Sequence, residues 1–365
     1  MTVPDFFPSR TVTIYMAKLF LTRSFAVLAL LVLVLQALDL LGESDKILAH
    51  PGNGQAQILQ YISLRAPGII QRFLPFSVLL GTLIAFMQLN QNSEVIAMKA
   101  AGLSAHQVLA PFMVASLFVA VVAFVFNERI VSRASATLSK WEAVEFGPIP
   151  DARGGVTNVW VRDGDDLIHA DIANGRGAGT RLTNVSVYDR SGGVLKSLVE
   201  ADSAKPMAGG WELDNTRVFD VAAGTRKALG TVRVAQGVRP DQFTLSSVDP
   251  LGLSYTELGT AIDDLDIAGR PTASLKANLL HKISGPLSTV LMPLLAAVAA
   301  FGLARSGKLF VRAVIGMALG FAYFVADNFG LAMGNLGAYP PLLAAWGPFV
   351  LFLALGEAVL IRTEE

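Results

Sequence analysis

The chain of 365 residues contains no cysteine. Disulfide bonds, thiolate metal sites and a cysteine nucleophile are therefore excluded. Charged residues are also scarce, at 16% of the chain, whereas hydrophobic residues make up 53% and the mean hydropathy is +0.51. This composition is typical of a protein that crosses a membrane several times rather than of a soluble enzyme. The formal net charge of zero does not indicate any class of partner, because in such a protein the position of each charge matters more than the sum.

Sequence motifs of enzymatic chemistry are missing as well. The sequence has neither HExxH nor GxSxG, and its histidines are too far apart along the chain to suggest a metal site: His50, His106, His169 and His281. Segment 302–308 has the glycine and lysine spacing of a phosphate-binding loop, but Leu309 stands where a Ser or Thr would hold magnesium. A tight basic turn between two apolar runs explains the same residues. We therefore predict that the chain is not an enzyme and binds no cofactor or metal itself.

Six long apolar runs lie three on each side of a polar, glycine-rich stretch. Each has about 20 residues, the length that an α-helix needs to cross roughly 30 Å of hydrocarbon. Gly42–Asp45 follows the first run in place of a small-x-small cleavage site, so we interpret that run as an uncleaved span rather than a signal peptide. The runs lie near Phe25–Leu41, Phe73–Leu89, Val108–Phe126, Ile283–Leu303, Phe310–Leu331 and Leu342–Ile361.

Basic residues near the spans indicate an orientation. One group falls on a single side of the membrane if both termini are cytoplasmic: Arg10, Lys18, Arg23, Arg305, Lys308, Arg312 and Arg362. A second group then lies on the outer side, where the rule disfavours it: Lys46, Arg65, Arg72, Arg129, Arg133, Lys276 and Lys282. Guanidinium and ammonium groups bind phosphates through charge-assisted hydrogen bonds, which suggests an anionic ligand at the outer leaflet. The alternative is that these side chains reach ordinary lipid headgroups.

Two acidic residues lie near the outer ends of spans, Asp39 in the first and Asp327 in the fifth. A charge at bilayer depth costs about 2.5–3.5 kcal/mol, so it usually faces a cavity, a partner or the interface. Ordinary solvation at the interface remains an open alternative for both. The candidate substrate-binding residues are Asp39, Lys46, Arg65, Arg72, Lys282 and Asp327.

With this orientation, the stretch from about Ile130 to Arg270 lies outside the cytoplasm. It is rich in short strand-like runs separated by glycine turns, and Val156–Val161 and Leu167–Ile172 flank Asp163-Gly164, a hairpin signal. This pattern predicts a β-sandwich or jelly roll, which could be a passive external domain or a functional one. We expect Ser254–Ala268 to form a short helix that leads back to the membrane.

The loop between the second and third runs predicts a short helix on the cytoplasmic side. Asn92 or Ser93 can cap it, Glu94 suits its first turn, and Gly102 can end it. Such a helix either lies at the lipid interface or docks into a soluble partner.

Small residues recur one helical turn apart in the fifth run, at Gly316 and Gly320 and again at Gly330 and Gly334. This spacing lets another helix backbone approach closely. The neighbour is either another helix of the same chain or a second subunit.

Several segments resemble the LptF/LptG permeases (YjgP/YjgQ type) of the lipopolysaccharide exporter. The similarity extends over nearly the whole chain, and within the family the Leu38–Leu40 region and the Trp160 segment are closer to LptG members. The segments that carry the resemblance are Tyr15–Lys18, Asp39, Pro75–Gly81, Ser93–Gly102, Trp160–Gly164, Lys282–Leu287, Asp327–Gly330 and Pro340–Pro341. The family often has lysine where Gln36 stands and basic residues at Gly42 and Glu43, so lipid-phosphate contacts are not carried over to the first span.

The resemblance implies a permease subunit of an ABC exporter in the Gram-negative inner membrane. In this family LptF and LptG form a heterodimer, an LptB dimer hydrolyses ATP with magnesium, and LptC and LptA continue the path of lipopolysaccharide through the periplasm. It also implies that Glu94–Gly102 is the coupling helix that docks into LptB. The candidate coupling residues are Ser93, Glu94, Val95, Met98, Lys99, Gly102 and Arg305.

Residue pattern and resemblance together predict a six-helix, all-α transmembrane domain with an inserted all-β periplasmic domain of the jelly-roll type. The expected boundaries are residues 1–130 for the first three spans, 131–270 for the β domain and 271–365 for the last three spans. Other readings are an LptF-type subunit, a half-transporter for another amphiphile such as a lipoprotein, and a membrane-anchored binding or sensing protein.

Overall fold

The computed structural model of the chain describes residues 8–148, 156–175, 179–191, 193–207, 210–234, 238, 240, 243, 249–267, 270–302 and 309–364. The chain divides into two compact units. The helical unit comprises Met1–Ser139, Pro250–Ile262 and Pro271–Glu365. The β unit comprises Lys140–Asp249 and Asp263–Arg270.

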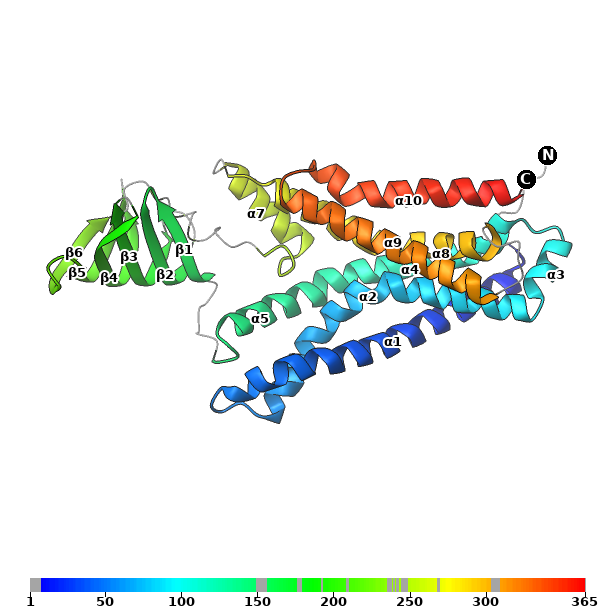
Figure 1. Cartoon of the computed structure of the whole chain (residues 1–365), viewed down its shortest axis with the longest axis horizontal. Helices are drawn as coiled ribbons and strands as arrows, with labels where there is room; N and C mark the ends of the chain where they lie inside the picture. The colour runs from blue at the N-terminus through cyan, green and yellow to red at the C-terminus, as the bar shows by residue number, and fades with distance from the viewer. Residues whose placement is uncertain are drawn as a thin grey trace. The chain divides into compact units, whose positions relative to one another are not determined.

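Six helices of the described chain are long and apolar enough to cross a membrane, which confirms the predicted spans. Two of them continue through a π-helical turn, one at Asn127–Val131 after α4 and one at Val298–Gly302 after α8. The short helix α3 (Glu94–Ala100) lies at the end of the bundle where α1 begins and α10 ends (Figure 1). The remaining helices are α1 (Arg10–Ala49), α2 (Gln55–Gln91), α4 (Ala105–Phe126), α5 (Ser132–Ala143), α7 (Tyr255–Ile267), α8 (Ala273–Ala297), α9 (Leu309–Asn335) and α10 (Pro341–Glu364).

The helices are longer than the apolar runs that predicted them. Helix α1 has 40 residues, about 60 Å at 1.5 Å per residue, which is twice the hydrocarbon thickness. Gly42–Asp45, which the sequence indicated as the end of the span, lies inside this helix. Hydropathy marks only the part of a helix that suits lipid, and polar residues such as Glu43 and Lys46, which form an i,i+3 ion pair, continue the helix beyond it.

Small residues bring the helices of the unit close together. A Cβ on Gly81 of α2 would lie 2.5 Å from the backbone N and Cα of Ser24 in α1. A Cβ on Gly316 of α9 would lie 2.6 Å from a methyl group of Leu83 in α2, and one on Gly334 would lie 2.5 Å from Ala344 in α10. The glycines of the fifth span thus pack against other helices of the same chain, which is one of the two alternatives left open by the sequence.

The β unit contains one antiparallel sheet in the order β1-β2-β3-β4-β5-β6, so each strand pairs with the next along the chain. The predicted hairpin at Asp163-Gly164 joins β1 and β2, with Asp163 paired to Asp166. The inserted all-β domain is confirmed, and its described strands have meander connectivity rather than the Greek-key pairing of many jelly rolls. The strands are β1 (Val156–Asp163), β2 (Asp166–Asn174), β3 (Arg181–Ser191), β4 (Val194–Met207), β5 (Gly210–Asp220) and β6 (Thr225–Val234).

A row of alternating Asn and Asp side chains crosses the first five strands. The strand register places each of these residues directly opposite the next one in the neighbouring strand. For example, the pairs Val159↔Ala170 and Thr157↔Ile172 enclose Asn158 and Asp171. All three asparagines have a left-handed φ of 50–58°, which Asn tolerates better than most residues. The members of this Asn/Asp row are Asn158, Asp171, Asn184, Asp202 and Asn215, and all are exposed.

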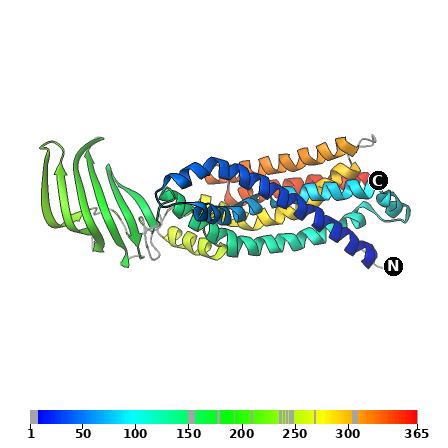
Figure 2. The same cartoon turned by 90° about the horizontal axis from the view of Figure 1, so that it is seen from below.

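The alternation of buried and exposed residues shifts by one position at the Asn/Asp row. In β3, Val187 and Val185 are buried two residues apart, but the next buried residue is Leu182, three residues away. Strand β4 shows the same step between Ala201 and Ala204. The apolar side chains on both sides of the row thus belong to one buried cluster, although the strands are curved (Figure 2).

Candidate functional site

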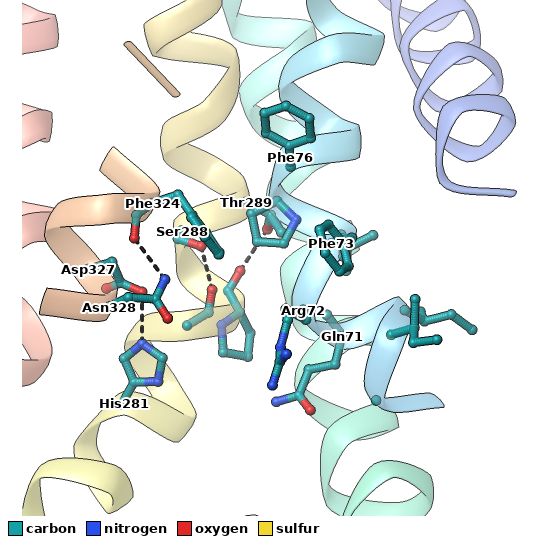
Figure 3. A pocket seen from close by; sticks show the side chains of 18 of the residues that line it. Gln71, Arg72, Phe73, Phe76, His281, Ser288, Thr289, Phe324, Asp327 and Asn328 are labelled. Atoms are coloured by element: carbon teal, nitrogen blue, oxygen red, sulfur yellow. Dashed lines mark hydrogen bonds and ion pairs between the residues drawn. The ribbon is translucent and has the colours of Figure 1, made fainter. Parts of the chain in front are cut away.

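A cavity of about 430 Å³ lies in the helical unit. Side chains of α1, α2, α4, α5, α8 and α9 line it, together with Pro250 and Leu251 of the segment before α7. Much of the wall is apolar, including Phe73, Phe76 and Phe324 (Figure 3). Among the candidate substrate-binding residues, Asp39, Arg65, Arg72, Lys282 and Asp327 line this cavity.

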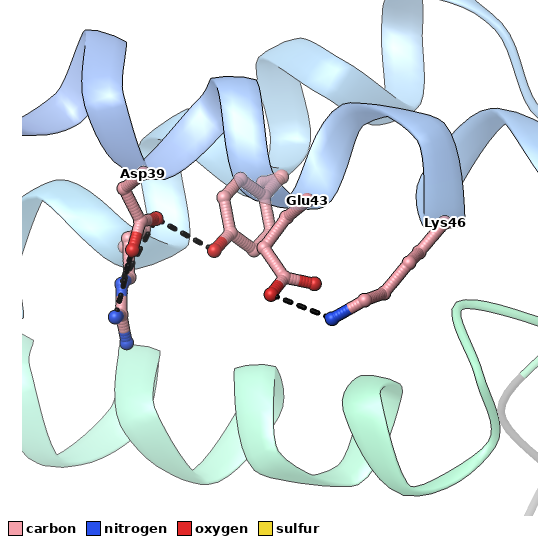
Figure 4. Close-up of polar contacts among 5 residues, drawn as sticks. Asp39, Glu43 and Lys46 are labelled. Atoms are coloured by element: carbon pink, nitrogen blue, oxygen red, sulfur yellow. Dashed lines mark hydrogen bonds and ion pairs between the residues drawn. The ribbon is translucent and has the colours of Figure 1, made fainter.

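Asp39 and Arg65 form an ion pair across α1 and α2. The Arg65 Nη2 atom donates to Asp39 Oδ1 over 2.9 Å, and Nε lies 3.2 Å from both carboxylate oxygens. The hydroxyl of the buried Tyr61 donates to Asp39 Oδ2 over 2.7 Å (Figure 4). Because its charge is matched by Asp39, Arg65 is less available to an anionic ligand than its position in the sequence suggested.

Lys46 lies outside the cavity lining. Its Nζ forms a 2.9 Å ion pair with Glu43 one turn earlier on α1, and the Lys46 side chain is 65% exposed (Figure 4). Exposed pairs of this kind contribute little to stability. The structure therefore separates Lys46 from the other candidate substrate-binding residues.

Asp327 joins α9 to α8 through His281. His281 Nε2 lies 3.0 Å from Asp327 Oδ2, and the two side chains are 25% and 15% exposed (Figure 3). Tyr323, one turn before Asp327 and almost fully buried, also lines the cavity. His281 and Tyr323 were not selected from the sequence, although Tyr323 is four residues from Asp327 and thus on the same helix face.

Arg72 and Lys282 supply further positive charge to the cavity wall. Arg72 is exposed and forms no hydrogen bond or ion pair with another residue in the part of the chain that the structure describes. Lys282 is only 7% exposed. Long basic side chains are rarely buried this far without a functional or structural reason.

Glu257 in the first turn of α7 lies in the field of Lys282 and Arg133. Its carboxylate accepts hydrogen bonds from the backbone N–H and the hydroxyl of Ser254, at 2.9 and 2.8 Å. The backbone hydrogen bond is the main reason why the pKa of Glu257 is lowered, and the two cations lower it further. Glu128, in the π-helical turn after α4, accepts from the backbone N–H of Tyr255 at 2.8 Å. The start of α7 is thereby tied to the cavity wall.

The short helix α3 begins and ends in left-handed residues. Ser93 occupies the N-cap position with φ 57° and makes no side-chain cap, so the predicted cap is not formed. Gly102 ends the helix as predicted, with φ 88°. The N–H groups of Gly102 and Leu103 bond to the carbonyls of Lys99 and Met98, the pattern of a Schellman motif.

One face of α3 packs on the bundle and the other is exposed. Val95 is buried and Met98 packs against the core, whereas Ile96 is 66% exposed and Lys99 is exposed. The Glu94 carboxylate accepts from the Tyr15 hydroxyl of α1 over 3.2 Å and from Asn92 over 3.1 Å. An apolar side chain held outwards on an anchored helix suits contact with a partner protein. Arg305, the remaining coupling candidate, lies outside the described residues.

The sequence model of the family "Lipopolysaccharide export system permease LptF/LptG" matches residues 14–362. The chain belongs to this family. It is 25% identical over 310 residues to the lipopolysaccharide export system permease protein LptG of Escherichia coli strain K12, covering 83% of this chain and 84% of that protein. The LptG protein of Haemophilus influenzae strain KW20 is also 25% identical, over 325 residues that cover 86% of this chain and 89% of that protein.

Membership of the LptF/LptG family confirms the resemblance noted in the sequence and the closer similarity to LptG members. Members of the family are permeases, which supports the prediction that the chain is a transport subunit rather than an enzyme. The matched region includes α3, the cavity and the inserted β unit.

Proposed function

We propose that this chain is an LptG-type subunit of an ABC exporter that extracts lipopolysaccharide from the Gram-negative inner membrane. LptF is the partner permease, an LptB dimer supplies ATP hydrolysis, and LptC and LptA receive the lipid. Both termini and α3 are cytoplasmic, and residues 131–270 form the periplasmic domain between the transmembrane parts 1–130 and 271–365. Family membership over residues 14–362 is the observation that carries this proposal.

The positions of α3 and of the cavity charges support the proposed orientation. Tyr15, which contacts Glu94 of α3, and Asp39, which lines the cavity, lie on the same helix. The 24 residues between their positions span about 36 Å, slightly more than the hydrocarbon core. With α3 in the cytoplasm, the charged end of the cavity is at the level of the outer leaflet.

The cavity suits a lipid that is apolar at one end and anionic at the other. Aromatic and aliphatic side chains cover its walls, whereas Arg72 and Lys282 supply positive charge. Burial of each acyl CH₂ in the bilayer is worth about 0.8 kcal/mol, so extraction of a lipid with several chains needs an energy source. We infer that this energy reaches the cavity through α3, with Glu94, Val95 and Met98 anchoring it.

The remaining coupling residues have distinct proposed roles. Lys99 contributes to the surface that meets LptB, while Ser93 and Gly102 fix the two ends of the helix. Arg305 would act in the cytoplasmic link between α8 and α9.

Photo-crosslinking of lipopolysaccharide tests the cavity. A photoreactive amino acid at Phe73, which lines the cavity, should capture the lipid in the assembled transporter, whereas one at Phe118, 64% exposed on α4, serves as a control for ordinary membrane contact. The double variant Arg72→Glu/Lys282→Glu should lose the crosslink at Phe73. The single variant Arg72→Gln should weaken the crosslink as well, and it leaves the buried Lys282 unchanged.

The charge variant Lys46→Glu is the matched control, because Lys46 lies on the same side but outside the cavity. Equal crosslinking in Arg72→Gln, the double variant and wild type would remove these residues from the binding site. Failure of the wild-type complex to capture lipopolysaccharide at Phe73 while native mass spectrometry finds another amphiphile would overturn the substrate itself.

A further inference from the structure

One wall of the cavity carries a polar cluster made by His281 of α8 with Tyr323 and Asp327 of α9. The His281–Asp327 contact of 3.0 Å uses Nε2 of the imidazole. The ring's other nitrogen, Nδ1, lies beside Gly285, where even an added Cβ would be 3.6 Å away. Both His281 and Gly285 line the cavity, so the glycine leaves room next to Nδ1.

The hydroxyl of Tyr323 is the least explained group in this cluster. Tyr323 is 3% exposed, and its Oη atom lies near Asp327 and Ser288 without completing a hydrogen bond to any described residue. The Ser288 hydroxyl instead donates to the Gly285 carbonyl over 2.6 Å. The Tyr323 ring is held edge-on against Phe352, with centroids 5.4 Å apart. A buried hydroxyl without a partner is costly, and such groups usually have a ligand or water to bond.

Donor groups reach the cavity from the opposite wall as well. Figure 3 shows Arg72 and Gln71 of α2 extending toward the space that His281 and Asp327 of α8 and α9 face. A guanidinium donates through several N–H groups and has no acceptor, a tyrosine hydroxyl donates one proton, and a protonated imidazole donates from both nitrogens. A ligand that bonds to all three must supply several acceptor oxygens. A phosphate monoester or diester does so and carries the negative charge that Arg72 and Lys282 favour.

We propose that His281 and Tyr323 contact a phosphate group of the transported lipid, and that Asp327 is a positioning residue that orients His281. The carboxylate of Asp327 is occupied by the imidazole and repels a phosphate, so it is not itself a ligand. This assignment rests on the proposed transport of lipopolysaccharide and revises the role given to Asp327 from the sequence.

Tyr323→Phe is the sharpest test, because it removes one oxygen and leaves the packing of the ring on Phe352. Without ligand, loss of an unpartnered buried hydroxyl leaves the melting temperature of the transporter unchanged or raises it. With ligand, loss of a hydrogen bond to a charged group weakens binding about tenfold or more. His281→Gln, which keeps a donor to Asp327 but cannot carry charge, should weaken binding by a similar factor. Tyr339→Phe, in the loop between α9 and α10, is the matched control.

Binding is measured with the assembled transporter in nanodiscs, using lipopolysaccharide and the same lipopolysaccharide after enzymatic removal of its phosphates. The expected result is that Tyr323→Phe and His281→Gln weaken binding of the phosphorylated lipid only. An equal loss for both probes would show that the cluster binds a neutral group, and no loss for either would show that it does not touch the lipid; both outcomes overturn the assignment. In both cases wild-type binding stands and the proposed transport function survives, whereas absence of wild-type binding refutes that function.

Discussion

The closest approach of α1 and α2, at Ser24 and Gly81, gives a prediction about stability. In Gly81→Ala the new methyl carbon would lie 2.5 Å from the backbone N and Cα of Ser24. Optimal carbon contacts are about 3.5–4.0 Å, so α1 must move by about 1–1.5 Å. Backbone atoms cannot rotate away as a side chain can, and the displacement must be taken by the whole helix. Arg65 and Asp39 bridge the same two helices further along, at 2.9 Å, and a movement of this size would also lengthen their hydrogen bonds.

Overpacking of this kind costs about 1–3 kcal/mol. A domain of about 150–250 residues loses about 2–4 °C in melting temperature per kcal/mol, so Gly81→Ala should melt about 2–12 °C below wild type. The assay is thermal unfolding of the purified complex in one detergent, followed by intrinsic fluorescence.

Gly42→Ala is the control for this substitution. Gly42 is an exposed glycine inside α1 with open space around its Cα, and alanine there should be neutral or stabilise the helix by up to about 1 kcal/mol. Adding Ser24→Gly to Gly81→Ala removes the hydroxyl but leaves the backbone N and Cα in place, so it should not restore the melting temperature. A Gly81→Ala variant as stable as wild type, or full rescue by Ser24→Gly, would refute the packing argument.

Two further predictions concern α3 and α7. Glu94→Lys loses the hydrogen bonds from Tyr15 and Asn92, and it should reduce the amount of ATPase that co-purifies with the chain. Glu94→Gln keeps an acceptor and should retain more of the co-purifying ATPase. Equal co-purification of the ATPase with wild type and both variants would contradict the docking role. Because the folded-state pKa of Glu257 is lowered, its carboxylate stabilises the first turn of α7 fully above its usual pKa of 4.5, and this contribution is lost as the pH falls through the lower folded value. Protection of the α7 amides, measured by hydrogen exchange and referred to the intrinsic exchange rate at each pH, should therefore fall as the sample is acidified. Glu257→Gln should abolish this loss of protection, and the same pH dependence of protection in both proteins would exclude Glu257 as its source.

The spans, the hairpin and the end of α3 followed from local chemistry. Twenty apolar residues, an Asp-Gly pair and a glycine after a short helical pattern each restrict the backbone strongly, and the structure has the predicted element at each place. The helix ends were less predictable, because α1 continues through polar residues that favour neither lipid nor a turn.

The site was only partly predictable because pairing depends on the fold. The sequence shows that Arg65 is basic but not that Asp39 of another helix balances its charge. Likewise, the sequence shows that Asp327 is acidic but not that it contacts His281, which lies 46 residues earlier on α8. Residues close in sequence can also have different surroundings. Lys46 follows Asp39 by only two turns of the same helix, yet Lys46 is exposed to solvent.

The Asn/Asp row makes the strands of the inserted sheet depend on one another. In β2, β3, β4 and β5 the alternation of buried and exposed residues shifts by one position, and in each of these strands the shift falls at this row. If β3 alone lost its left-handed residue, Asn184, it would fall out of register with both neighbouring strands and turn its apolar side chains beyond that point to water. Neighbouring strands can therefore keep or lose this shift only together, so the exposed Asn/Asp row constrains which apolar side chains can be buried on the opposite side of the sheet.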